Sequence, residues 1–109
     1  MSKFPVPGQA WLLEQCGLKY DIDVSEWFKD GCLVRAKYPT MEDLWEACKK
    51  AGDVEPKTMY VVIRETCVVI EEIDGTHVKR YWLSDYGSIT SALAAALGWL
   101  KGWNAYPEN

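Results

Sequence analysis

Two adjoining segments constrain the fold of this sequence most: a valine- and isoleucine-rich stretch from Met59 to Leu83, and a strongly apolar stretch from Ile89 to Lys101. Within the first, Met59–Ile63 and Cys67–Ile70 predict two β-strands joined by a tight turn, with one long bent strand as the alternative. Asp74-Gly75 predicts a hairpin to a third strand, since this dipeptide favours hairpin turns. The sequence therefore predicts an antiparallel meander of three strands followed by a long helix.

The register of the predicted hairpin determines which side chains face that helix. A two-residue loop would pair Val69 with Arg80 and leave neither face apolar, so we expect a three-residue loop with its glycine in a bulge. This register sets His77 opposite Glu71. It places four apolar side chains on the other face: Val68, Ile70, Val78 and Trp82.

The predicted C-terminal helix is apolar around most of its circumference. Its alanines would let it lie close against a sheet. Residues 89–100 fall short of the ~20 apolar residues that a membrane-spanning helix needs. We therefore expect no membrane association.

The N-terminal half predicts short elements separated by glycines. Gly8–Cys16 is typical of a brief helix that Gly17 ends in a left-handed cap. We interpret Glu26–Asp30 as a second short helix, capped by Ser25. Leu33–Tyr38 alternates apolar and basic residues, which indicates a short strand at the edge of a sheet.

A better-marked helix begins after Pro39, where Thr40 and Asp43 approximate a capping box. Gly52 is expected to end this helix. Together these elements predict one α+β domain over residues 1–109. A small antiparallel β-meander, of three strands or of four if 33–38 joins its edge, packs against the long C-terminal helix, with short helices at the N-terminus.

The formal net charge of −4 argues against direct nucleic-acid binding, because that requires clustered lysine and arginine. Acidic side chains concentrate in the N-terminal half. They are either a solvated surface that aids solubility or a patch that steers the chain onto a basic partner. The members of this group are Glu14, Asp21, Asp23, Glu26 and Asp30.

The cysteine pattern argues against a metal site and against secretion. Cys16, Cys32, Cys48 and Cys67 are widely spaced, whereas zinc sites usually combine ligands paired at short spacing. The N-terminal residues contain no apolar signal segment. We therefore expect reduced, buried cysteines in a cytoplasmic protein without metal or cofactor.

Two positions offer candidate chemistry. His77 opposite Glu71 could act as a base, but catalysis also needs a nucleophile and a pocket, so we expect an ordinary cross-strand charge pair. The turn Ser84–Ser88 opens a helix and could hold an anion. It lacks the lysine and glycine spacing of a phosphate-binding loop, so helix capping by Ser88 is its expected role.

Tryptophan is unusually abundant, with six residues in 109. A small core cannot enclose so many indoles, so some must lie at the surface, where tryptophan contributes most to binding. Trp45, Trp82 and Trp99 are expected in the core. Four aromatic residues on short or terminal elements are candidates for partner contact: Trp11, Trp27, Trp103 and Tyr106.

These expectations combine in the hypothesis of a non-enzymatic, cytoplasmic protein-binding module, an inhibitor or adaptor that occludes a partner surface. Phage anti-defence proteins of the anti-CRISPR type and toxin-immunity proteins share this size and composition, but no residue motif links the chain to them. The partner would be a protein with a basic surface, and the chain itself a monomer or homodimer. The alternatives are a small-molecule or anion sensor that uses the 84–88 turn, and an enzyme that uses His77.

Overall fold

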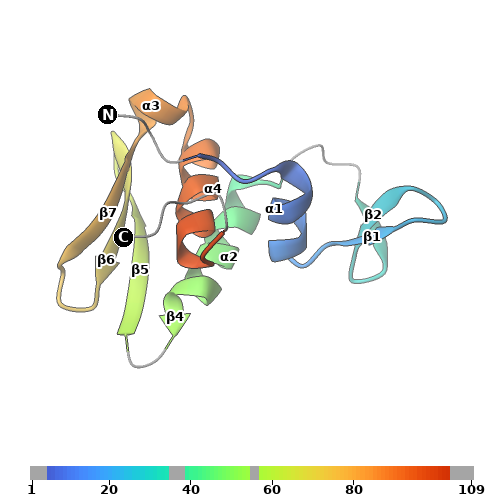
Figure 1. Ribbon diagram of the computed structural model, residues 1–109, viewed down its shortest axis with the longest axis horizontal. Helices are drawn as coiled ribbons and strands as arrows, with labels where there is room; N and C mark the ends of the chain where they lie inside the picture. Colours follow the sequence, from blue (N-terminus) through green and yellow to red (C-terminus); the bar gives the residue numbers. More distant parts are fainter. Residues whose placement is uncertain (1–4, 35–38, 55–56, 104–109) are drawn as a thin grey trace.

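A computed structural model of the chain describes residues 5–34, 39–54 and 57–103 (Figure 1). The elements, in chain order, are α1 (Gln9–Gln15), β1 (Lys19–Asp21), β2 (Glu26–Lys29), β3 (Cys32–Val34), α2 (Met41–Gly52), β4 (Asp53–Val54), β5 (Lys57–Ile63), β6 (Cys67–Glu72), β7 (His77–Trp82), α3 (Leu83–Tyr86) and α4 (Ile89–Leu100). The strands form two antiparallel sheets, with the orders β4-β5-β6-β7 and β1-β2-β3. The predicted α+β class is confirmed.

The molecule is elongated, 45 × 31 × 28 Å, with the larger sheet at one end and the smaller sheet at the other (Figure 1). We call the larger sheet with α1, α2, α3 and α4 the body, and the smaller sheet, residues 19–34, the arm. In the body, α2 and α4 pack on the same side of the sheet. The predicted arrangement of a meander against a long C-terminal helix is therefore correct.

The apolar spacing of α4 explains how the body holds together. The helix is buried without interruption from Ala92 to Gly98, because it lies against both the sheet and α2. Leu93 and Leu97 are completely buried, and each such side chain contributes roughly 1.5–3 kcal/mol relative to an exposed one. The alanine methyl groups around them let the backbone of α4 approach the sheet closely.

The predicted capping box of α2 is present. The Asp43 backbone N–H donates to the Thr40 hydroxyl at 3.2 Å, and the Asp43 carboxylate accepts from the Thr40 backbone at 3.3 Å. The helix ends at Gly52, as predicted, but glycine is needed there for a reason that the sequence did not indicate. A Cβ at Gly52 would collide with the backbone carbonyl of Met59 on β5, so glycine is required by a close approach rather than by a left-handed backbone.

The β6–β7 hairpin has the predicted loop but not the predicted register. Gly75 has φ +88°, and Glu71 lies opposite His77, as the three-residue loop requires. A bulge next to this pair then shifts the ladder by one residue, so that Ile70 pairs with Lys79.

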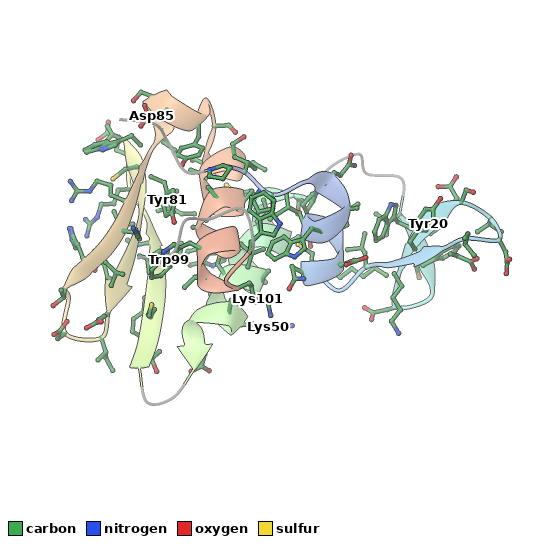
Figure 2. All side chains as sticks on the ribbon, in the orientation of Figure 1. Tyr20, Lys50, Tyr81, Asp85, Trp99 and Lys101 are labelled. Atoms are coloured by element: carbon green, nitrogen blue, oxygen red, sulfur yellow. The ribbon has the colours of Figure 1, made fainter. Side chains whose placement is uncertain are left out.

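This shift exchanges two aromatic side chains between the faces of the sheet. Tyr81, opposite Val68, enters the core and is 1% exposed. Trp82 lies on the opposite face and is 44% exposed, so the prediction that it packs in the core is wrong. Figure 2 shows Tyr81 and Trp99 on the helix side of the sheet.

The second predicted helix is also wrong, because Glu26–Lys29 forms strand β2 at the centre of the arm. Asp30 and Gly31 have φ of +52° and +81°, and they form a two-residue turn that pairs β2 with β3. Cys32–Val34 therefore belongs to the arm and not to the edge of the larger sheet. The short fourth strand of that sheet is β4, and residues 35–38 of the expected strand lie outside the described residues.

Candidate interaction surfaces

The arm keeps its shape through turns and cross-strand pairs rather than through a core. None of residues 19–34 is fully buried. Tyr20 pairs with Trp27 across β1 and β2, with ring centroids 5.3 Å apart, and Val34 lies on the other side of Trp27. An open hollow of about 530 Å³ is lined by residues of the arm and of the α1–β1 connection, among them Phe28 and Gly17.

The turn between β1 and β2 presents apolar side chains to solvent at the end of the arm (Figure 1). Ile22 is 81% exposed and Val24 is 56% exposed. Tyr20 and Leu33, on the strands behind this turn, are 50% and 43% exposed. Sequence reasoning missed Ile22 and Val24, although their alternation with aspartate between two predicted short elements was a usable signal.

The acidic residues of the N-terminal half separate into three places. Asp21, Asp23 and Glu26 surround the exposed β1–β2 turn, where the Asp23 backbone N–H donates to the Asp21 carboxylate at 2.9 Å. Asp30 lies at the other end of β2, in the β2–β3 turn, and Glu14 lies on α1. The structure therefore brings together three of these carboxylates beside Ile22.

An ion pair links the arm to the body, with Lys29 Nζ 3.2 Å from Asp43 Oδ1. Partial burial pushes the pKa of the Asp43 carboxyl upward. Hydrogen bonds from the Thr40 hydroxyl, from Lys29 and from the Thr40 backbone outweigh this effect and hold that pKa below its ordinary value. One carboxylate thus caps α2 and anchors β2.

The number of tryptophans predicted that the core could not enclose all of them, and none of the six is fully buried. Trp11 packs against the body core and lies 6.2 Å from Trp103, centroid to centroid, where α1 meets the end of α4. Trp45 and Trp99 also pack against the core, as predicted. Tyr106 lies outside the described residues.

The side of the larger sheet away from the helices is a second candidate surface, which we call the outer sheet face. The alternation of the strands places on it Tyr60, Arg64, Glu71, His77, Arg80 and Trp82. Tyr60 is 49% exposed, and the Arg80 guanidinium carbon lies 5.1 Å from the centre of the Trp82 ring. Of this face, the sequence predicted only the Glu71–His77 pair.

A chain of hydrogen bonds crosses the outer sheet face. Arg64 Nη2 donates to Glu71 Oε1 at 2.8 Å, and His77 Nε2 lies 3.1 Å from the same oxygen. Arg80 Nη2 lies 3.0 Å from His77 Nδ1, and because arginine can only donate, Nδ1 must accept. The hydrogen bond from Arg64 holds the pKa of the Glu71 carboxyl below its ordinary value, and His77 lowers that pKa by a smaller amount.

The remaining candidate positions have structural roles. The Ser88 hydroxyl accepts from the Ser91 backbone N–H at 3.1 Å and caps α4, as predicted, while Ser84 and Asp85 belong to the short helix α3.

Burial raises the pKa of the Cys48 thiol to about 12. Burial, with a smaller contribution from Asp43, raises the pKa of the Cys16 thiol to about 11. Both shifts oppose thiolate chemistry.

The cysteines are only partly as predicted. The four thiols are free, and Cys48 and Cys67 are buried. Cys16 is half-buried, and Cys32 is exposed on β3 because that strand belongs to the arm.

Within the described ranges, no three histidine, cysteine or carboxylate side chains come together as ligands for a metal ion. No helix in these ranges has both the length and the apolar character needed to cross a bilayer. Comparisons with protein-family models, with curated proteins and with solved structures found no match to this chain.

Proposed function

We propose that the chain is a non-enzymatic, cytoplasmic protein-binding module, a small inhibitor or adaptor that occludes a partner surface with its arm. One observation carries the proposal: the β1–β2 turn presents Ile22, 81% exposed, and Val24, 56% exposed, at the end of a projecting sheet. Exposed apolar groups in a cluster are typical of interaction sites, because their burial is the main source of binding free energy.

The carboxylates around this turn indicate the character of the partner. Asp21, Asp23 and Glu26 form an acidic rim beside the apolar residues. Such a rim favours a partner surface with basic side chains around an apolar hollow, and charge complementarity of this kind mainly raises the association rate. Trp27, behind the turn, stiffens the arm through its contact with Tyr20.

The test is a capture experiment from lysate of cells that carry the gene, with wild-type chain and two matched variants as bait. Ile22→Asp places a charge in the proposed contact. Ile73→Asp makes the same change at a residue that is 76% exposed in the β6–β7 turn, at the other end of the molecule.

We expect the wild type and Ile73→Asp to capture the same protein in stoichiometric amount. Ile22→Asp should bind it at least about tenfold more weakly, since a central apolar contact contributes more than about 1.4 kcal/mol. Thermal unfolding should be the same for all three chains. Equal capture by Ile22→Asp and the wild type would contradict the proposal.

A further inference from the structure

The arm and the outer sheet face lie at opposite ends of the molecule and point in opposite directions. α1, α2 and α4 stand between the sheet and the arm, so the face of the sheet that the helices leave open is directed away from the arm (Figure 1). The two surfaces of one molecule therefore cannot meet. Only a second copy can bring an arm to this face.

The two surfaces carry side chains of opposite charge. The end of the arm carries the carboxylates of Asp21, Asp23 and Glu26, all on exposed residues. On the outer sheet face, Arg64 and Arg80 stand beside the carboxylate of Glu71, which Arg64 already engages at 2.8 Å. An acidic arm is therefore attracted to this face.

The two surfaces also match in apolar character. Ile22 and Val24 extend from the arm and are 81% and 56% exposed. The outer sheet face exposes Tyr60 and Trp82, at 49% and 44%. Flat aromatic rings beside arginine are the side chains that most often anchor protein–protein contacts.

From this match we propose that the outer sheet face binds the arm of a second copy, so that copies of the chain associate head to tail. The inference rests on the proposed binding role of the arm and names one occupant for the face that receives it. The two contacting surfaces are different, so each added copy leaves one free arm and one free face. Such a heterologous contact generates an open chain or a ring rather than a closed dimer.

The test uses two variants that each block one end of the molecule. Ile22→Ser with Val24→Ser removes the apolar contact of the arm, and Arg64→Gln with Arg80→Gln removes the positive charge of the face. The substituted residues are exposed, so both variants should fold. Sedimentation equilibrium would be measured for each alone and for an equal mixture, up to about 1 mM protein.

We expect the average mass of the wild type to rise steadily above 12.4 kDa with concentration and to fall again on addition of salt. Each blocked variant alone should remain a monomer. The mixture should stop at a dimer, because it combines one intact arm with one intact face. Two matched controls, Ile73→Ser and Lys49→Gln with Lys50→Gln, should associate as the wild type does.

A wild type that stays monomeric at about 1 mM, or a mixture that does not dimerise, would overturn this inference. So would association that the Arg64→Gln, Arg80→Gln variant retains. These outcomes are independent of the capture experiment with Ile22→Asp. A chain that stays monomeric but loses its partner on that change would refute head-to-tail association and leave the proposed function standing.

Discussion

In the body, Val68 and Leu93 are completely buried between a sheet and two helices, whereas in the arm no residue from 19 to 34 is fully buried. The same chain thus contains one region held by its core and another held by hairpin turns, a Tyr20–Trp27 contact and an ion pair to α2. The difference teaches where stability and binding reside. The body supplies the folding free energy, and the arm is free to expose apolar side chains that a core would otherwise bury.

Hydrogen exchange should show the largest difference between the two regions. Backbone amides of β6, buried in the body, should exchange only on global unfolding, while amides of β2 in the arm should exchange through local opening. We expect protection in β6 to exceed that in β2 by at least about 1000-fold, or about 4 kcal/mol. Equal protection would show that arm and body unfold as one cooperative unit.

Truncation of an apolar side chain should have very different effects in the two regions. Leu93→Ala leaves a cavity in a site that is 0% exposed, and should lower the free energy of unfolding by about 2–5 kcal/mol. Ile22→Ala, at a site 81% exposed, should change it by less than about 0.5 kcal/mol. Urea unfolding followed by circular dichroism would measure both. A large loss for Ile22→Ala would mean that the arm is part of the core.

Two glycines allow the backbone to be compared in the same way. Gly52→Ala would force the new methyl group against the Met59 carbonyl and should cost about 1–3 kcal/mol of global stability. Gly31→Ala meets no atom within 4 Å and is strained only by its φ of +81°, at a cost of about 1 kcal/mol. That cost should appear as faster exchange in the arm, with no change in the global unfolding midpoint.

The smallest expected effect concerns pH and the junction between the two regions. The pKa of Asp43 in the folded chain is below its ordinary value, so its stabilisation is present above the unfolded pKa and is lost as pH falls through the folded one. Asp43→Asn should therefore flatten the loss of stability below about pH 4, with an effect of at most about 1 kcal/mol. Glu42→Gln, which removes an exposed carboxylate from the same turn, is the matched control.

The body could be predicted because its signals are local and mutually consistent. The capping box at Thr40 and Asp43, the valine-rich strands and the apolar periodicity of α4 each specify one element without reference to the rest. The placement of Trp82 could not be predicted, because a single bulge next to Glu71 reverses the faces of β7, and nothing in the alternation of residues marks that bulge.

The sequence of the arm predicts the wrong element for a different reason. Ser25 and Gly31 resemble helix caps, so the segment between them is typical of a short helix, although Asp30-Gly31 is the same hairpin dipeptide as Asp74-Gly75. The candidate site was nevertheless partly located, because Trp27 and the acidic residues of 21–30 are on the arm. Their contact with a partner stays a prediction, as does that of Trp11 and Trp103, which pack against each other.

The alanine surface of α4 has a consequence for how this protein can change. Because Ala92, Ala95 and Ala96 are fully enclosed, a larger residue at any of them would push the helix off the sheet. Substitutions at the exposed residues of the arm disturb this packing far less. A new specificity could therefore arise in the arm without loss of the scaffold that carries it.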